Sequence, residues 1–166
     1  MIRRESPGDT AAIALVLEQA FGRLQEAILV DRLRGLEGNI SLCALHDGEV
    51  IGYLFLSPVS VETQRPGARL AGLGPMGVLP GFQKKGFGSA LMQEGLDACF
   101  TAGYDGVVVL GHPEYYTRFG FLPASKFGLM CPYEVPDPVF MAQELRKSGL
   151  DGCKGIVRYP DAFDAV

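Results

Sequence analysis

The residues best suited to chemistry stand in one glycine-rich segment in the middle of the chain, Val78–Leu91. It carries Gly86 and Gly88 one residue apart, after a run typical of a strand and at the start of a run typical of a helix. Such glycines let the main chain approach a bulky ligand, and the first N–H groups of a helix point outward together. Lys84 and Lys85 add positive charge. The segment therefore favours an anion site, and phosphate is the natural ligand.

Two familiar phosphate motifs fit this segment poorly. A Walker loop needs a Gly-Lys-Ser or Gly-Lys-Thr end, which is absent after these glycines. A dinucleotide-binding fingerprint needs a third glycine where Leu91 stands. That fingerprint also normally follows the first strand of its domain, whereas this segment follows about the fourth. Both nucleotide interpretations are therefore disfavoured.

The pattern Gln83-x-x-Gly86-x-Gly88 resembles the acetyl-CoA pyrophosphate loop of the GNAT superfamily of N-acetyltransferases, whose signature is Q/R-x-x-G-x-G/A. Downstream, Tyr115–Phe121 is similar to the family segment (F/Y)-Y-x-(K/R)-x-G-F. The order of elements matches over roughly three-quarters of the chain, and residues 122–166 resemble a less-characterised bacterial branch. The resemblance implies transfer of an acetyl group from acetyl-CoA, as co-substrate, to a primary amine through a tetrahedral intermediate.

The resemblance also implies which residues bind the cofactor. The strand residues Met76, Gly77 and Val78 would pair with pantetheine as though it were an extra strand. One of their N–H groups would also polarise the thioester carbonyl and stabilise the oxyanion. The pyrophosphate would be held, largely by main-chain N–H groups, at Gln83, Lys84, Lys85, Gly86, Phe87, Gly88 and Ser89.

Tyr116 matches the position of the family's usual general acid, which protonates the departing CoA thiolate. A tyrosine with a pKa near 10 and a thiol near 8.5 allow that transfer without large tuning.

The general base is less defined. Many family members carry a glutamate on the interrupted strand, but Arg69–Leu79 contains no carboxylate or histidine. His112 follows the buried strand Val107–Leu110 at its C-terminal end, where sites open in α/β sheets. Glu26 lies in the second helical region, which often lines the acceptor site in this family. A third alternative is that no base exists and the amine arrives neutral.

The elements that position these residues follow from periodicity and turn signals. Gly74-Pro75 predicts a bulge or a break in its strand, because proline cannot donate to a ladder. A strand, a helix and a strand joined by short connections predict a parallel pair. The predicted strands are Ile2–Glu5, Ile40–Leu45, Val50–Leu56 (ending at Ser57-Pro58), Arg69–Leu79, Val107–Leu110 and Gly155–Arg158. The first predicted helix begins at Pro7, with Ser6 as its cap and Asp9 completing a capping box. The other predicted helices are Leu24–Arg34, Gly86–Thr101, Glu114–Phe119 and Asp137–Leu145, the last capped by Asp137.

The fold class expected is α/β: a GNAT-like mixed, mostly antiparallel central sheet with helices on both faces and a parallel β-α-β pair flanking the acetyl-CoA loop. The length of 166 residues fits a single domain over 1–166. Hydrophobic residues make up 48% and charged residues 20%, which excludes a disordered chain.

Composition also limits location and partners. The net charge of −4, without a basic stripe, argues against nucleic acid as a partner. No run of apolar residues suits a membrane span, and no secretory signal begins the chain. Four cysteines without C-x-x-C pairs and two histidines give no metal-ligand spacing, so we expect no metal, free thiols and a cytoplasmic location.

The acceptor itself is open among small metabolites, antibiotics, peptide N-termini and protein lysines. Two alternatives to N-acetyl transfer also remain: a CoA- or acyl-CoA-binding module without turnover, and an acyltransferase that uses another acyl donor or a hydroxyl acceptor. A homodimer is plausible for such a fold, although no segment identifies an interface.

Overall fold

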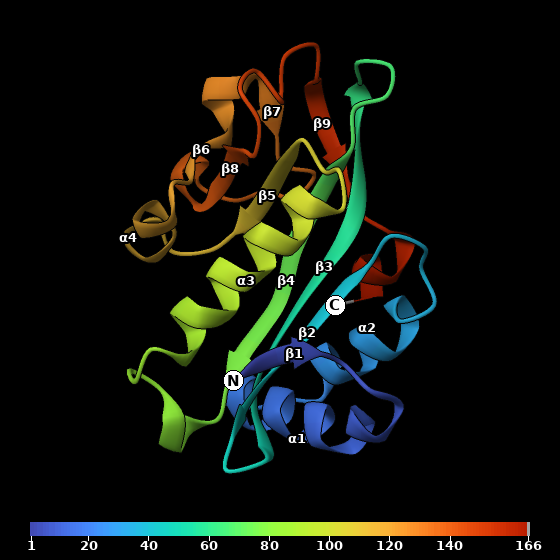
Figure 1. The fold of residues 1–166 in the computed structure, drawn as a ribbon. Coiled ribbons are helices and arrows are strands. Elements are labelled where there is room, and N and C mark those ends of the chain that lie inside the picture. The colour runs from blue at the N-terminus through green and yellow to red at the C-terminus, as the bar shows by residue number, and fades with distance from the viewer. Residues whose placement is uncertain (166) are drawn as a thin grey trace. The chain divides into compact units, whose positions relative to one another are not determined.

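The computed structural model describes residues 1–165, and its elements are labelled in Figure 1. The helices are α1 (Thr10–Phe21), α2 (Gln25–Leu33), α3 (Phe87–Thr101) and α4 (Pro113–Tyr116). The strands are β1 (Ile2–Arg4), β2 (Ile40–His46), β3 (Glu49–Thr63), β4 (Leu70–Val78), β5 (Gly106–Leu110), β6 (Leu122–Pro123), β7 (Leu129–Met130), β8 (Phe140–Glu144) and β9 (Lys154–Arg158).

The chain groups into two compact units, each assembled from separate stretches of sequence. The first comprises Met1–Ser57, Gly74–Gly95 and Asp161–Val166, and the second comprises Pro58–Leu73 and Leu96–Pro160. The strand order is β1-β2-β3-β4 in the first unit and β4-β5-β8-β6 in the second, so β3 and β4 contribute residues to both. That the chain is a single domain stays a prediction.

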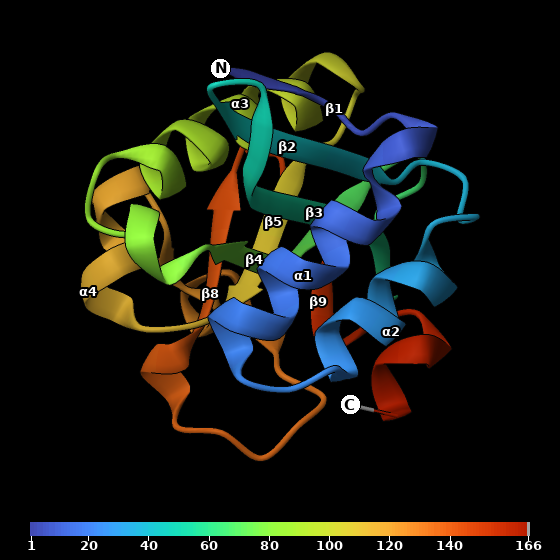
Figure 2. The ribbon, with the colours of Figure 1, turned by 90° about the horizontal axis from the view of Figure 1, so that it is seen from below.

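In the first unit, the central strand β3 is covered by helices on both faces. Tyr53 and Phe55 point into a core that contains residues of α1 and α2, which pack side by side (Figure 2). The side chain of Leu54 points to the opposite face of β3 from Tyr53 and Phe55, and it packs against Gly95 of α3. Two-sided burial of this strand was predicted from its apolar run and is confirmed.

The β2–β3 hairpin turns at Asp47-Gly48, as predicted. Both residues have positive φ angles, 51° and 78°, which is the backbone of a type I′ turn. The pairing closes at His46↔Glu49, so His46 stands directly beside the turn.

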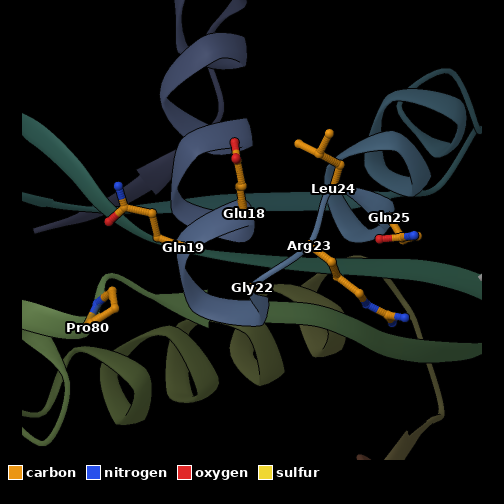
Figure 3. Close-up of a pocket in the computed structure, with 7 residues that line it drawn as sticks. All are labelled: Glu18, Gln19, Gly22, Arg23, Leu24, Gln25 and Pro80. Atoms are coloured by element: carbon orange, nitrogen blue, oxygen red, sulfur yellow. The ribbon is translucent and has the colours of Figure 1, made fainter.

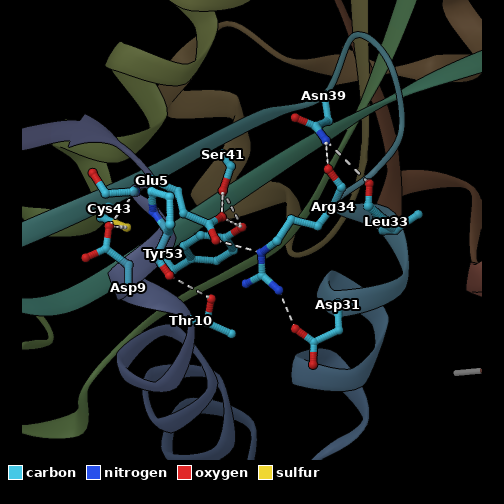
Figure 4. A network of polar contacts seen from close by, with 12 residues as sticks. Glu5, Asp9, Thr10, Asp31, Leu33, Arg34, Asn39, Ser41, Cys43 and Tyr53 are labelled. Carbon is cyan, nitrogen blue, oxygen red and sulfur yellow. Dashed lines mark hydrogen bonds and ion pairs between the residues drawn. The ribbon is translucent and has the colours of Figure 1, made fainter.

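A partly buried polar network ties the end of β1 to the neighbouring elements of the first unit (Figure 4). Arg34 donates Nε–H to Glu5 Oε2 at 2.6 Å, and the hydroxyl of fully buried Tyr53 lies 2.5 Å from Ser41 Oγ. Ser41 in turn donates to Glu5. Each of these side chains has a hydrogen-bond partner, so the network links β1, β2 and β3 to the end of α2 without leaving a polar group unpaired.

The first helix begins later than predicted. Pro7–Asp9 form a 3₁₀ turn and α1 starts at Thr10. The Asp9 carboxylate accepts the N–H of Ser6 at 2.7 Å, as the capping pattern predicted. Arg3 donates to both oxygens of Asp9, at 2.6 and 3.0 Å, and this hydrogen bonding lowers the pKa of Asp9 to about 2.

The predicted break in β4 is present. In the second unit β4 pairs with β5 in parallel from Leu70↔Gly106 to Leu73↔Val109, and this register ends at Leu73. Gly74 has a φ of 144°, which only glycine adopts readily, and the Gly74–Pro75 peptide bond is cis. After Leu73, the main chain of β4 makes no further ladder hydrogen bonds with β5 in the described residues.

Two predictions of secondary structure are wrong, one of a helix and one of where a strand ends. The expected helix over Asp137–Leu145 is one 3₁₀ turn, Asp137–Val139, followed by strand β8, which pairs antiparallel with β5. The Asp-Pro start is a local signal, whereas Phe140 and Ala142 gain burial and a full ladder as a strand. Likewise β3 does not end at Ser57-Pro58, because Pro58 falls between the register with β2, which ends at Leu56, and that with β9, which begins at Ser60.

The four cysteines form no disulfide, and Cys43, Cys99 and Cys153 are buried. Burial raises the pKa of Cys43 to about 12, so its thiol is protonated and serves packing. Within residues 1–165, no helix combines the length and the apolar character that crossing a bilayer would require.

Candidate cofactor and catalytic site

The glycine-rich segment leaves β4 and enters α3 through a short, well-anchored turn. Leu79 donates its N–H to Ile51 O at 2.8 Å, and a 3₁₀ turn over Pro80–Phe82 follows. Lys84 and Gly86 then adopt positive φ angles of 61° and 91°. These two left-handed residues reverse the chain so that it enters the 15-residue helix α3 directly.

The main-chain donors of this turn are not used inside the protein. In the described residues, the N–H groups of Lys84 through Gly88 donate to no protein acceptor. Further along, Ala90 donates its N–H to Gly86 O, at 3.0 Å. A row of free donors at the positive end of a long helix is suited to an anion.

Gln83 contributes to this turn through its side chain. Its Nε2 donates to Val78 O at 3.0 Å, which ties the turn back to the end of β4. Its own N–H points to Pro80 O at 3.5 Å. Gln83 therefore shapes the turn that presents the neighbouring donors.

An aromatic cluster from the β2–β3 hairpin supports the same turn. The ring of His46 lies 5.3 Å from Phe82 and 5.9 Å from Phe87, and these two phenylalanines are 6.0 Å apart. The Lys85 ammonium lies 5.8 Å from the Phe82 ring. The sequence indicated His46 only as part of a turn, because nothing local connects the hairpin with a segment nearly forty residues away.

The side chains predicted for catalysis lie at the end of β5 and in α4, in the second unit. Tyr116 packs edge-on against Phe121, with ring centroids 5.8 Å apart, and against Tyr115, at 5.0 Å. No residue from 1 to 165 bonds to its hydroxyl, which is not fully enclosed. Burial, with a smaller contribution from Tyr115, raises the pKa of Tyr116 to about 12, so the expected value near 10 is corrected upward.

His112 directly precedes α4 and accepts the N–H groups of Tyr115 and Tyr116 with its main-chain oxygen, at 3.0 and 3.2 Å. Its side chain is exposed, and its ring has no partner among the described residues. His112 and Tyr116 are thus joined through the main chain of one helical turn.

Glu26 lies at the start of α2 and is buried, with 5% of its surface exposed. Arg23 binds both of its carboxylate oxygens, through Nε–H to Oε1 at 2.9 Å and through Nη2 to Oε2. The charge of Glu26 is therefore neutralised by its neighbour, and the pair fixes the linker between α1 and α2.

This linker forms one side of an open hollow of about 670 Å3 (Figure 3). The hollow is bounded by the end of α1, the linker, the start of α2 and Pro80, which opens the 3₁₀ turn before the glycine-rich segment. Its lining residues are Glu18, Gln19, Gly22, Arg23, Leu24, Gln25 and Pro80. Glu18 and Gln19 were not predicted from the sequence, although their exposed place on α1, just before the capping Gly22, was a usable signal.

The predicted residues divide between the units. Met76, Gly77, Val78, Glu26 and residues 83–89 belong to the first, and His112 and Tyr116 belong to the second. Within the first unit, α1 covers Gly77 so closely that a Cβ there would lie 2.9 Å from Ala20 Cβ. Within residues 1–165, no three His, Cys, Asp or Glu side chains gather as metal ligands would.

Comparison with known proteins agrees with this geometry. The family model described as Acetyltransferase (GNAT) family matches residues 10–121. The chain is 35% identical to the uncharacterized N-acetyltransferase YhbS of Escherichia coli, over 99% of this chain and 98% of that protein. It is 32% identical to E. coli YjhQ, also an uncharacterized N-acetyltransferase, over 78% of this chain and 74% of that protein.

Solved structures give the same result. The crystal structure of E. coli YhbS in complex with CoA superposes with a TM-score of 0.92 at 35% identity, covering 99% of this chain and 91% of that one. A GNAT family acetyltransferase from Brucella melitensis in complex with acetyl-CoA superposes with a TM-score of 0.80 at 36% identity, covering 99% and 97%. With the family pattern, the mixed sheet and the donor-rich turn in place, the chain belongs to the GNAT family of acetyltransferases.

Proposed function

We propose that the protein transfers the acetyl group of acetyl-CoA to a primary amine by direct attack on the thioester. The observation that carries this proposal is the row of unused N–H donors from Lys84 to Gly88 at the start of α3. In the proposal they bind the pyrophosphate, with Lys84 and Lys85 adding charge and Ser89 adding its hydroxyl. That relatives were crystallised with CoA and acetyl-CoA supports this assignment.

Next to the turn, Met76, Gly77 and Val78 receive the pantetheine arm. The ladder with β5 ends at Leu73, so this part of β4 lacks that strand partner and suits pairing with an extended ligand. One N–H on this stretch polarises the thioester carbonyl and stabilises the oxyanion as the tetrahedral intermediate forms. Positioning and this polarisation supply most of the acceleration.

Tyr116 is the general acid in this proposal. When the intermediate collapses, the carbonyl double bond re-forms, the C–S bond breaks and the sulfur takes the bonding pair, while the hydroxyl donates toward that sulfur. The extra proton on the attacking nitrogen leaves through solvent, which balances the proton needed to form the thiol. The raised pKa keeps the hydroxyl protonated at neutral pH. Its lack of a partner among residues 1–165 leaves it free to donate.

The proton of the acceptor ammonium goes to His112. Of the two candidates, His112 has an exposed, unpartnered ring, whereas both oxygens of Glu26 are bound by Arg23. We therefore place Glu26 in the acceptor-binding region, where its ion pair shapes the linker beside the hollow. If the amine arrives neutral, the loss of His112 is without effect, and a His112→Ala variant distinguishes the two routes.

The test is thiol release from acetyl-CoA in the presence of a library of primary amines, with matched alcohols as a control. Turnover with amines, and none with alcohols, is the expected result. Tight acetyl-CoA binding by calorimetry without turnover of any acceptor would instead identify a binding module. Faster thiol release from longer acyl-CoA donors would reassign the donor while keeping the reaction class.

A further inference from the structure

The hollow at the α1–α2 linker contains one charged side chain that nothing in the described protein neutralises. Of its two charged residues, Arg23 is bound to Glu26 through two nitrogens. The carboxylate of Glu18 has no hydrogen bond or ion pair with any residue from 1 to 165. Because Glu26 offsets the charge of Arg23, the hollow carries the one negative charge of Glu18.

The rest of the lining suits a flexible cationic chain. The side-chain amides of Gln19 and Gln25 make no hydrogen bonds to the described residues, and their oxygens can accept from an ammonium group. Leu24, whose surface is 54% exposed, offers an apolar contact beside Gln25. Figure 3 shows Glu18 on α1, with Leu24 and Gln25 to one side of it and Gln19 and Pro80 to the other.

The hollow also adjoins the turn that joins β4 to α3. Pro80, which lines it, opens the 3₁₀ turn that leads into the donor-rich residues. A ligand in the hollow therefore lies next to the segment that binds acetyl-CoA in the proposed function.

We propose that the acceptor carries a second cationic group besides the amine that is acetylated, and that Glu18 binds this second group. The substrate class is an α,ω-diamine or an amine of similar charge spacing, with its alkyl portion against Leu24. This inference rests on the proposed function, since it assigns the acceptor of that same reaction.

The experiment compares 1,5-diaminopentane with 1-aminopentane, two amines of equal chain length that differ in the distal charge. We expect kcat/KM to favour the diamine by up to about fivefold at low salt, the range for a solvent-exposed ion pair. In Glu18→Gln the ratio should fall to about one, and in the wild type it should decline at 0.5 M salt through screening. Glu94→Gln, which changes an exposed glutamate of α3 away from the hollow's lining, should keep the wild-type ratio.

Equal use of both amines by the wild type, or an unchanged ratio in Glu18→Gln, would overturn the assignment of Glu18 while leaving the transferase in place. If neither amine is acetylated, the two amines are compared by calorimetric binding. A diamine preference lost in Glu18→Gln then supports the hollow's selectivity, while the amine library decides the transferase proposal separately. Equal binding of the two amines overturns the assignment of Glu18.

Discussion

The ionisation of Tyr116 decides how this residue takes part in the proposed reaction. Its pKa of about 12 exceeds that of an ordinary thiol by about 3.5 units, or about 5 kcal/mol. Full transfer of the proton from Tyr116 to the CoA thiolate is therefore unfavourable. The hydroxyl instead donates a hydrogen bond that strengthens as negative charge develops on sulfur, and the proton released by the new amide nitrogen reaches the thiolate through solvent.

This role predicts a specific kinetic defect. Tyr116→Phe should lower kcat by roughly 10- to 10³-fold, with little change in the KM for acetyl-CoA, because the ring packing is kept and only the donor is lost. In the wild type, kcat should not fall between pH 8 and pH 10.5, since a group with a pKa raised to about 12 stays protonated there. A tyrosine with an ordinary pKa would be losing its proton. Wild-type turnover in Tyr116→Phe would remove the residue from the mechanism.

Gly111 lies directly against the ring of Tyr116, and its lack of a side chain leaves room for that ring. A Cβ at Gly111 would lie 2.8 Å from Tyr116 Cδ2, which is too close for both groups to keep their positions. The φ angle of Gly111 is not in the left-handed region, so alanine there acts through this contact alone.

We therefore expect Gly111→Ala to lower kcat by about tenfold or more while the KM for acetyl-CoA stays near the wild-type value. Overpacking should also lower the free energy of unfolding by about 1–3 kcal/mol. Gly35→Ala is the matched control, because no atom lies within 4 Å of a Cβ at that position. Both variants are measured by steady-state kinetics and thermal unfolding, and an unchanged kcat in folded Gly111→Ala would show that the ring tolerates displacement.

At the scale of elements, the β2–β3 hairpin supports the cofactor turn through His46. Phe82 and Phe87 flank the segment that carries the free donors, and His46 contacts both rings. Each aromatic pair is worth about 0.5–1.5 kcal/mol beyond its buried area. The hairpin thus limits the conformations of this turn, which in the proposed function must be ordered to bind the pyrophosphate.

Removing this support should affect binding and not chemistry. We expect His46→Ala to raise the KM for acetyl-CoA by about three- to tenfold with kcat unchanged. His46→Phe should restore most of the affinity, because it keeps a ring while removing the imidazole nitrogen that lies 3.4 Å from Asp47 Oδ2. Should His46→Phe behave like His46→Ala, the polar contacts of the imidazole and not ring packing would be responsible.

The elements also show where local sequence signals suffice. The turn at Asp47-Gly48 and the break at Gly74-Pro75 were predictable, because each is dictated by residues within the segment itself. Strand β8 was not predictable in the same way, since Asp137-Pro138 favours a helix start locally and only pairing with β5 makes Phe140–Glu144 a strand. The prediction failed where a contact between distant segments outweighed local propensity.

The same distinction applies to the site across the whole chain. The glycine-rich turn and Tyr116 could be proposed from sequence because a short pattern carries each of them, and their roles stay predictions. His46 and Glu18 were not, because their relevance depends on rings or a hollow formed by segments far apart in the sequence. Net charge was equally uninformative: the chain carries −4, yet its cofactor turn combines two lysines with the positive end of a helix.

For the whole molecule, acetyl-CoA should act as a stabilising ligand whose effect depends on the conformation of one glycine. A Cβ added at Gly81 or at Gly86 would meet no atom within 4 Å, so alanine fits sterically at both positions. Only Gly86 has a positive φ, 91°, so only there does a Cβ strain the backbone. Gly86→Ala should therefore distort the row of donors, and Gly81→Ala should leave it intact.

A ligand that binds only the folded state adds about 2.7 kcal/mol to the free energy of unfolding at a concentration of 100 Kd. If Gly86→Ala weakens acetyl-CoA binding about tenfold, the same concentration adds only about 1.4 kcal/mol, whereas Gly81→Ala should keep the full increment. The increment, measured by thermal unfolding with and without acetyl-CoA, is the right quantity because strain at Gly86 also lowers the stability of the unliganded protein. Equal increments in the two variants would mean that the backbone at Gly86 does not shape the phosphate site, and the donor row would then lose its assigned role.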